Sequence, residues 1–535
     1  MKTYALSMDK NLVAIGFRRV VAAARAAGFD IQSIFFLDNI KRASLSGSWW
    51  KQNTDTEFSV NYVKNDEAII NLAKILADAD NLIFSTMSVQ SKFVQDIIRE
   101  TKKLNPKIVT LVGGYHPTIF PKDAIEFADV ICLGEGERTL IEFLKRVQNG
   151  EPFDGLPNSW FKRGEEIIKN PQIPLLTQDE LDAMPYMDTG LQDNFIFSLE
   201  EGKLYPQEQK DVIQHLGTTY NTIWSVGCPF VCSFCSQDTM ISLNKGFAKH
   251  RGRSPRSFVD EIKEGIKLYP TDYVIFWDSD FWGRNIEDLR EFTRLYRDEV
   301  GLKFVISGSN PVSIKEEKLD LLLEAGLVRI KMGFEGGNEE ILKILKRAGR
   351  TKKLREATKV LASRKNTMVA PSFEMILDNP LETTDQLYQT LDFLFETPGP
   401  YTLNLFSMHF MPGTALSELC TDEIGVEEEI DKEYMFSYQP THINNLISIL
   451  AIFKPPRFLF NFFKKMIKGR EHVKAPKVKK ILYHSMLVRR AFNQARFGDY
   501  TTFPYWVMVY YHKWRLFKNR LFGNRGGKTI RGVSP

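Results

Sequence analysis

The sequence predicts an α/β protein with two parallel sheets and an α-rich C-terminal region. Strands alternate with helices from the N-terminus, the alternation pauses near residue 150, and it resumes near residue 218. The last hundred residues change character and become basic and aromatic. Alternating strands and helices are typical of parallel sheets covered by helices. At 535 residues the chain is also too long for one compact domain.

Residues 1–150 predict a Rossmann-like, doubly wound sheet. Segments with helical periodicity alternate with short apolar runs, and such runs are typical of buried strands. The strands of this domain are expected at 3–7, 30–37, 81–85, 107–112 and 129–133.

Small and polar residues follow three of these strands. Ligands of doubly wound sheets bind at the carboxyl ends of the strands, so these turns are candidate binding residues. No G-x-G-x-x-G pattern follows the first strand, which makes a nicotinamide cofactor a weaker choice. The candidates are Ser85, Ser88, Gly113, Gly114, His116, Gly134 and Glu135.

Residues 151–217 are rich in proline and turn signals, and we expect a linker with a hairpin around Arg163–Glu166. Residues 218–430 then predict six strand–helix units, which fit a full or partial barrel. The barrel strands are expected at 221–225, 273–277, 304–307, 329–334, 368–376 and 402–410.

Residues 431–535 form a predicted helical region with an uneven charge. From Lys454 onward, twenty Lys and Arg residues stand against two acids, Glu471 and Asp499, although the net charge of the chain is only +5. Such a basic segment on an acidic body suggests an anionic partner. The apolar face that includes Phe458 and Phe462 suits an interfacial helix on an anionic membrane. That face could instead pack on the barrel, and nucleic acid is a weaker option because no RNA-binding module is recognisable.

Three cysteines, Cys228, Cys232 and Cys235, form a C-x3-C-x2-C run directly after the first barrel strand. Three thiolates at these spacings can ligate three irons of a cubane. The fourth iron is then free to chelate a small molecule through an amine and a carboxylate. A structural zinc site normally needs four protein ligands, and no obvious fourth His or Cys lies near. The run therefore indicates a [4Fe–4S] cluster in a reducing compartment.

This motif, with Phe234 before its third cysteine, resembles the cluster loop of radical S-adenosylmethionine (SAM) enzymes. The fuller pattern resembles their cobalamin-binding branch, which includes methylases and anaerobic cyclases, over about residues 1–430. The resemblance implies that SAM binds at the open iron and is cleaved reductively to a 5′-deoxyadenosyl radical. It also implies an electron donor of the flavodoxin or ferredoxin type.

The resemblance assigns contacts to several residues. Asp278 and Asp280 lie where the branch places carboxylates near the SAM amino group, and Glu335 with Gly336 resembles its ribose-contacting segment. The turns after the N-terminal strands resemble those that contact cobalamin. The motif that supplies a cobalt-ligating histidine in some cobalamin domains is absent, so His116 is expected to cap its turn or touch the cofactor's tail. The segment Asp378–Thr383 also lacks the glycines of the usual form.

Together these features predict a cobalamin-dependent methyltransferase that acts on a hydrophobic substrate such as a lipid, isoprenoid or tetrapyrrole. Two alternatives remain open. One is a non-methylating enzyme that forms a ring or a C–C bond and carries a vestigial cobalamin domain. The other is a non-catalytic iron–sulfur binding or sensing protein. Without a signal-peptide pattern or a membrane-spanning apolar run, we expect a cytoplasmic protein, at most peripheral to the inner face of the membrane.

Overall fold

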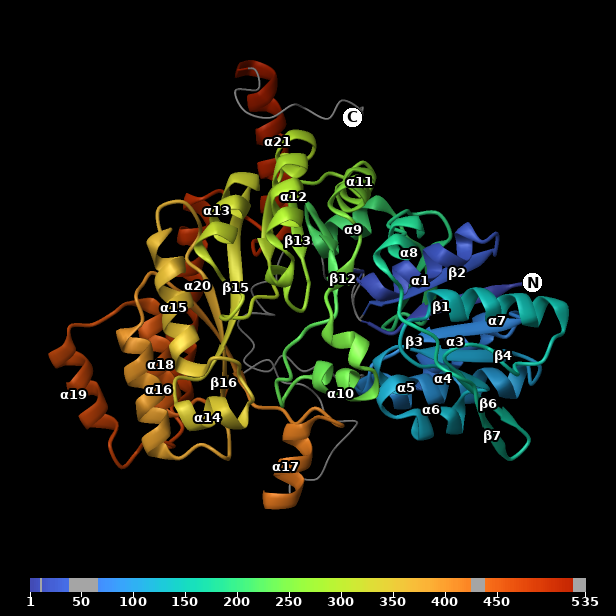
Figure 1. Ribbon diagram of the computed structural model, residues 1–535, viewed down its shortest axis with the longest axis horizontal. Helices are drawn as coiled ribbons and strands as arrows, with labels where there is room; N and C mark the ends of the chain where they lie inside the picture. The colour runs from blue at the N-terminus through green and yellow to red at the C-terminus, as the bar shows by residue number, and fades with distance from the viewer. Residues whose placement is uncertain (10–11, 38–65, 425–437, 523–535) are drawn as a thin grey trace.

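The computed structural model describes residues 1–9, 12–37, 66–424 and 438–522. Two sheets make up the body of the molecule (Figure 1). The N-terminal sheet lies at the right of the view, the second sheet lies at the centre, and most of the C-terminal helices cover the far side of the second sheet. This arrangement confirms the α/β class predicted from the sequence.

The N-terminal sheet has nine strands in the order β7-β6-β5-β4-β3-β1-β2-β8-β9. Strand β1 pairs in parallel with β2 on one side and with β3 on the other, so the chain reverses its winding direction at β1. Ligands of doubly wound sheets bind beside such a switch point. The five predicted strands are β1 (Thr3–Ser7), β2 (Ile31–Leu37), β3 (Asn81–Ser85), β4 (Val109–Gly113) and β5 (Val130–Cys132).

Helices cover this sheet in two pairs. Helix α1 (Ile15–Ala26) packs against α7 (Glu137–Asn149), and α3 (Asp66–Leu76) packs against α4 (Ser91–Leu104). The two pairs belong to separate hydrophobic clusters, which is the pattern of a sheet buried on both faces. The apolar strand sequences that predicted these elements reflect that double burial.

Residues 151–217, which we expected to be a linker, extend the N-terminal sheet at both edges. The expected hairpin forms β6 (Ser159–Arg163) and β7 (Glu166–Lys169) beside β5. A second hairpin, β8 (Asn194–Ser198) and β9 (Lys203–Pro206), adds to β2 at the other edge. Both hairpins cover backbone groups that an open edge would leave unpaired. The prolines and turn residues mark the ends of short strands rather than an unstructured connection.

The second sheet has six parallel strands in sequence order, and its two edge strands do not pair with each other. Helices on its outer face include α11 (Pro255–Gly265) and α12 (Ile286–Glu299), which pack against each other. This is the partial barrel predicted from the sequence. Its strands are β10 (Thr219–Thr222), β13 (Tyr273–Phe276), β14 (Lys303–Ile306), β15 (Leu327–Glu335), β16 (Ser372–Leu377) and β17 (Thr402–Ser407).

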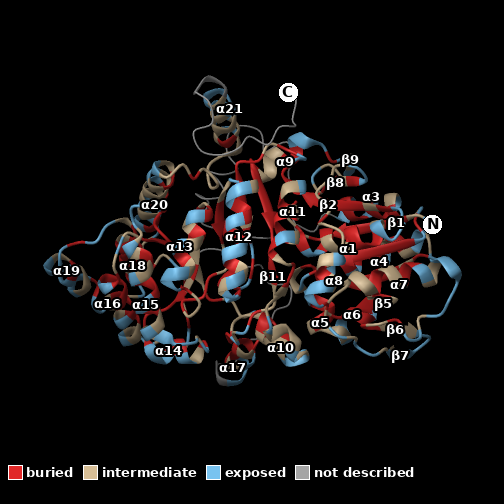
Figure 2. Cartoon of the chain, turned by 45° about the horizontal axis from the view of Figure 1, so that its top comes forward, coloured by how far each residue is buried: buried red, intermediate tan, exposed pale blue. Residues whose placement is uncertain are grey.

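The C-terminal region is helical, as predicted. Helix α18 packs against α16 (Thr384–Glu396), α20 and β17, and thereby joins the region to the barrel. Helix α19 extends from the end of the molecule farthest from the N-terminal sheet (Figure 2). No helix in the described ranges is both long and apolar enough to cross a bilayer. The helices are α18 (His442–Ile452), α19 (Arg457–Ile467), α20 (Pro476–Arg496) and α21 (Tyr505–Phe522).

Candidate active site

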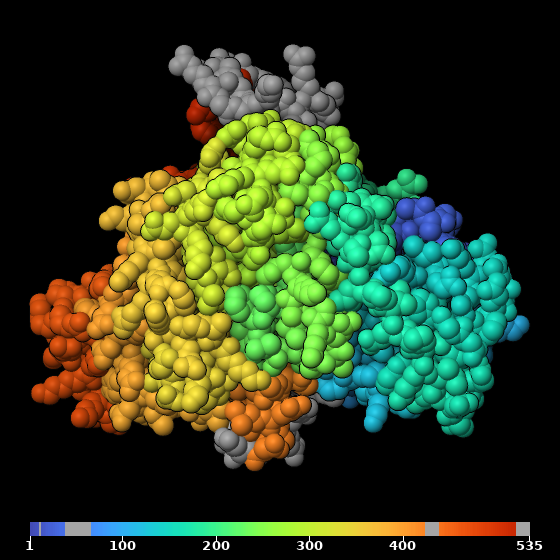
Figure 3. Space-filling view, viewed as in Figure 1, coloured from blue at the N-terminus to red at the C-terminus, as the bar shows by residue number. Residues whose placement is uncertain are grey.

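A cavity of about 400 Å³ lies between the N-terminal sheet and the barrel. Its first wall is built from the carboxyl ends of β3, β4 and β5, and it includes Ser85, Gly113, Gly114, Gly134 and Glu135. Its second wall comes from the barrel segments directly before the first cysteine of the motif (Ser225–Gly227) and after the third (Gln237 and Met240), together with Phe247 and Arg251. The lining is mostly apolar, and the volume is typical of a small-molecule site. In the space-filling view the two halves of the chain meet along this boundary (Figure 3).

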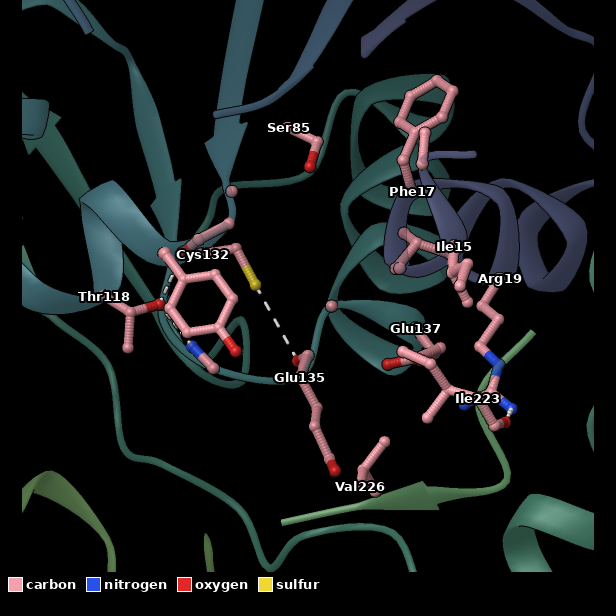
Figure 4. Close-up of a pocket in the computed structure, with 18 of the residues that line it drawn as sticks. Ile15, Phe17, Arg19, Ser85, Thr118, Cys132, Glu135, Glu137, Ile223 and Val226 are labelled. Atoms are coloured by element: carbon pink, nitrogen blue, oxygen red, sulfur yellow. Dashed lines mark hydrogen bonds between the residues drawn. The ribbon is translucent and has the colours of Figure 1, made fainter. Parts of the chain in front are cut away.

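Glycine allows the turns of the first wall to form. Gly114 has a φ of 107°, and a Cβ there would lie 2.6 Å from the carbonyl oxygen of Thr86. Gly134 has a φ of 79° and faces the ring of Phe247, which belongs to the second wall. Residues with a side chain rarely adopt either of these positive φ values, so these turns require glycine. Figure 4 shows Ser85, Thr118 and Cys132 along this wall.

Ser88 and His116 lie behind the first wall and do not line the cavity. The buried His116 ring contacts Asp123 Oδ2 through Nε2 at 2.8 Å and Ser88 Oγ through Nδ1 at 3.3 Å. Burial lowers the pKa of His116, and Asp123 opposes that shift. The pair anchors the short helix α5 (Tyr115–Ile119) under the wall.

An ion pair connects the two walls. Arg251 Nη1 donates to Glu135 Oε1 at 2.6 Å, and the amide of Leu176 donates to Glu135 Oε2 at 2.7 Å. Both charged side chains are largely buried. Nε and Nη2 of Arg251 are buried at the cavity without a hydrogen-bond partner. Arg251 therefore has donors available for an acceptor in this space.

The cysteine motif forms a loop between β11 (Ser225–Val226) and α10 (Ser236–Leu243). Gly227 starts the loop with a φ of 91°, and a Cβ there would lie 2.2 Å from the carbonyl oxygen of Lys249. Ser233 fixes the loop by donating to the carbonyl of Ile344 and accepting from the amide of Leu416. All three cysteines are free thiols.

The thiols lie in a desolvated environment. Burial raises the pKa of Cys228 to about 12 and also raises the pKa of Cys235. A coordinated metal reverses this effect, because a coordinating thiol loses its proton. Within the described residues, no three or more His, Cys, Asp or Glu side chains gather closely enough to hold a single metal ion. Thiolates that bind separate irons of a cubane do not need to converge on one point.

Arg347 is a functional candidate that the sequence did not reveal. Its Nη1 donates to Cys232 Sγ at 3.3 Å, its Nη2 donates to the carbonyl of Gly333 at 2.8 Å, and Nη2 lies 3.9 Å from Glu335 Oε1. Glu335 has a φ of 64°, and burial raises its pKa to about 7 although Arg347 opposes that shift. Arg347 therefore joins the cysteine loop to the end of β15. No local motif marks it, because it is one of several basic residues around the short connection between α14 (Glu339–Ile344) and α15 (Arg350–Ser363).

The two aspartates that were predicted to lie near the SAM amino group, Asp278 and Asp280, have different environments. Asp278 accepts from the amides of Ser225 at 2.5 Å and Trp224 at 3.2 Å, and burial raises its pKa to about 6. It therefore holds the strand that leads into the cysteine loop. Asp280 accepts from Ser313 Oγ at 2.9 Å, and its Oδ1 is buried without a partner. Gly336 follows Glu335, and its amide donates to the carbonyl of Phe334.

Two domain families match this chain. Residues 1–144 match the B12 binding domain, and residues 222–394 match the radical SAM superfamily. The fold and the site therefore define a radical SAM enzyme with a B12-binding domain in front of its barrel. The chain belongs to the radical SAM superfamily.

Curated relatives share about a quarter of the aligned residues. The chain is 24% identical over 419 residues to the cytidylyl-2-hydroxyethylphosphonate methyltransferase of Streptomyces wedmorensis. This alignment covers 73% of this chain and 75% of that protein. The chain is 24% identical over 299 residues to the anaerobic magnesium-protoporphyrin IX monomethyl ester cyclase of Rubrivivax gelatinosus, which covers 54% of this chain. That match spans 49% of the cyclase, about half of its length.

A solved structure supports the fold over almost the whole chain. The cobalamin-dependent S-adenosylmethionine radical enzyme OxsB, solved with aqua-cobalamin and S-adenosylmethionine bound, matches with a TM-score of 0.60 at 14% identity. The match covers 97% of this chain and 80% of that one. At this identity the likeness shows the fold.

The cofactors of this class are a [4Fe–4S] cluster, SAM and cobalamin, and the described residues fit them. Three thiols on one loop suit a cluster with one open iron. The orphan Asp280 Oδ1 suits an ammonium group such as that of SAM. The glycine turns and the orphan Arg251 donors suit a bulky cofactor with amide acceptors between the domains.

Proposed function

We propose that this protein is a cobalamin-dependent radical SAM methyltransferase that acts on a hydrophobic substrate. The observation that carries the proposal is the shared cavity. One wall consists of the turns of the B12-binding domain, and the other includes Val226 and Gly227, directly before Cys228. A methyl donor held by the first wall would face the radical site at the second. A relative named as a methyltransferase also aligns over 73% of the chain.

When bound, SAM with the cluster supplies a 5′-deoxyadenosyl radical, and cobalamin supplies a transferable methyl group. The chain's own residues bind and orient these groups. Cys228, Cys232 and Cys235 hold the cluster, and Arg347 supports Cys232. The apolar lining of the cavity excludes water, which would otherwise quench reactive species.

We assign separate roles to the remaining polar residues. The SAM ammonium donates to the unpartnered Oδ1 of Asp280. Glu335 and Gly336 contact the SAM ribose. Asp278 supports the cysteine loop rather than touching SAM, because both of its oxygens already accept backbone hydrogen bonds.

The remaining contacts concern cobalamin. The turns with Gly113, Gly114 and Gly134 let the cofactor approach the backbone, and Ser85 donates to it. Glu135 orients Arg251 toward it. Ser88 and His116 support this wall from behind.

We also propose two kinds of partner. The cluster must receive one electron for each SAM cleaved, and a flavodoxin or ferredoxin would deliver it. A peripheral anionic membrane would supply or store the hydrophobic substrate. This choice is supported by the exposed apolar side chains of the C-terminal helices.

Anaerobic turnover with SAM labelled by deuterium at its methyl group tests the proposal. The protein is reconstituted with iron, sulfide and hydroxocobalamin and given lipid, isoprenoid and tetrapyrrole fractions. We expect 5′-deoxyadenosine, S-adenosylhomocysteine and a product that carries the labelled methyl group. Cys228→Ala should abolish 5′-deoxyadenosine and the labelled product, which both require the cluster, and should limit S-adenosylhomocysteine to at most about one equivalent per cobalamin. Cys420→Ala, a buried cysteine outside the motif, should leave all three products unchanged.

A non-methylating cyclase is the second candidate, because a relative named as a cyclase aligns over half of this chain. The same assay separates the two candidates. 5′-Deoxyadenosine without S-adenosylhomocysteine, and a product with no added carbon, would overturn methyl transfer and favour cyclisation.

A further inference from the structure

Exposed apolar side chains are concentrated at one end of the chain. Among the described residues, fourteen of the twenty-four exposed large apolar side chains lie between Phe453 and Phe517. That segment is about one eighth of the protein. Contiguous exposed apolar surface on a folded protein marks an interaction site.

Helix α19 has two apolar faces. Phe460 and Ile467 are buried on the inner face, where Phe460 stacks on Phe395 of α16 with ring centroids 4.2 Å apart. Phe458, Phe462 and Met466 follow one another at intervals of four residues on the outer face and are 75%, 57% and 61% exposed. Residues four apart share one side of a helix. The outer face is therefore a continuous apolar stripe, although the helix is already anchored through its inner face.

The next two helices repeat this pattern. In α20 the exposed apolar residues are spaced by three, seven and four positions. In α21 four of the five exposed apolar residues are spaced by four, four and three, and the fifth, Leu516, lies outside this stripe. Both spacings keep the side chains on one side of the helix. The residues are Val478, Ile481, Val488 and Phe492 in α20, and Trp506, Tyr510, Trp514 and Phe517 in α21.

The charge of these helices has one sign. There are three basic residues in α19, six in α20 and four in α21, and none of the three helices contains Asp or Glu. Lys465 and Lys468 are exposed beside the α19 stripe, and Lys518 Nζ lies 5.3 Å from the Trp514 ring centroid. Long basic side chains beside an apolar stripe can reach phosphate groups while their stems stay in apolar surroundings.

We propose that α19, α20 and α21 form a docking surface for an anionic phospholipid membrane, with α19 lying in the interface. Its aromatic and aliphatic side chains would enter the boundary between headgroups and acyl chains, and the flanking Lys and Arg would contact lipid phosphates. A second copy of the chain fits less well, because like charges would face each other across the contact. Nucleic acid would neutralise the charge but leave Met466 and Ile481 in water.

This inference deepens the proposed function, because a membrane is where a hydrophobic substrate is concentrated. Docking does not require methyl transfer. A vesicle-binding assay therefore tests the surface while the turnover assay tests the chemistry, and either can fail alone.

Flotation of the full chain with vesicles tests the surface. We expect binding to phosphatidylcholine vesicles that contain phosphatidylglycerol, little binding to phosphatidylcholine alone, and weaker binding at high salt. The combined variant Phe458→Ser, Phe462→Ser and Met466→Ser should lower the partition coefficient at least about tenfold. Because these side chains are exposed, its thermal unfolding should match that of the native protein.

A matched variant controls for the loss of three exposed apolar groups. The variant Ile70→Ser, Leu104→Ser and Leu268→Ser removes three exposed apolar side chains (44%, 54% and 45% exposed) from other regions and should bind vesicles like the native protein. The inference is overturned if the native chain does not float with anionic vesicles, or if both triple variants bind equally. It is also overturned if the α19 variant loses self-association or duplex DNA binding while vesicle binding is retained.

Discussion

At the scale of single residues, Arg347 gives the cysteine loop a positive charge. Its guanidinium donates to Cys232 Sγ and lies close to Glu335. Hydrogen bonds and charges near sulfur ligands set the reduction potential of an iron–sulfur cluster. Reduction adds negative charge to the cluster, so a neighbouring cation favours the reduced form.

We therefore expect Arg347→Met to lower the midpoint potential of the reconstituted cluster and to reduce SAM cleavage about 10- to 100-fold. The midpoint potential of Arg347→Lys should lie between that of the native protein and that of Arg347→Met. The measurement is a redox titration followed by electron paramagnetic resonance. Lys346→Met removes the neighbouring cation, which pairs with the carboxylate of Asp238 rather than with a cysteine sulfur, and should shift the potential less than Arg347→Met does. An unchanged potential in Arg347→Met would show that the contact does not influence the cluster.

Glu382 is a second residue whose environment has a measurable consequence. Burial raises its pKa to about 7, and a hydrogen bond from Thr390 opposes this shift only in part. The same Thr390 hydroxyl accepts from the amide of Gly337, so Glu382 is connected to the segment that follows Glu335. The folded protein therefore holds a proton on Glu382 at pH values where an unfolded glutamate has lost it.

The sign of the pH dependence follows from this shift. The stabilising contribution of protonated Glu382 is complete below about pH 4.5 and is lost as the pH rises to about 7. We expect Glu382→Gln to remove about 1–2 kcal/mol of this pH dependence, measured as the difference between urea-unfolding free energies across the range. Glu340→Gln, at an exposed position, should keep the native profile. Parallel profiles for the Glu382 variant and the native chain would contradict the prediction.

At the scale of elements, the turn after β5 and the strand β12 (Arg251–Gly252) form one of the connections between the two domains. Glu135 and Arg251 are largely buried, so removing one partner leaves the other charge desolvated. We expect Arg251→Met or Glu135→Gln to cost about 3 kcal/mol of unfolding free energy.

The double variant should cost less than the sum of the two single variants, with a coupling energy of about 1–3 kcal/mol in denaturant unfolding. Arg256→Met breaks a more exposed pair with Glu299 and should change stability by less than about 1 kcal/mol. Additive effects of the Glu135 and Arg251 substitutions would mean that the two side chains do not act as a pair.

At the scale of the whole molecule, the B12-binding domain and the barrel share one cavity, and neither encloses it alone. A ligand that binds only the folded, assembled walls stabilises both of them, by about 2.7 kcal/mol at a hundredfold excess over its dissociation constant.

Hydroxocobalamin should therefore slow amide hydrogen exchange in both walls at once. We expect protection around Gly113–Thr118 and also around Ser225–Cys228, with α19 unchanged as an internal control. Protection confined to the N-terminal turns would assign the cofactor to one domain and remove the main support for methyl transfer.

The sequence by itself determined the strands that are buried on both faces and the spacing of the cysteines. Both are local properties: Leu82–Phe84 is an uninterrupted apolar run, and Cys228, Cys232 and Cys235 lie within eight residues. These local patterns predicted the doubly wound sheet, the partial barrel and the class of enzyme. They also located the glycine turns that line the cavity.

Only the tertiary structure decided which polar groups meet. Arg251 reaches Glu135 across 116 positions, and Arg347 reaches Cys232 across 115, so no local pattern could reveal either contact. Residues 151–217 form sheet edges because distant strands offer them unpaired backbone groups. Ser88 and His116 turn away from the cavity for a similar reason, since Asp123 and the packing of α5 provide partners behind the wall. Periodicity and spacing are local properties of the sequence, whereas the partners of buried polar groups depend on how distant segments pack.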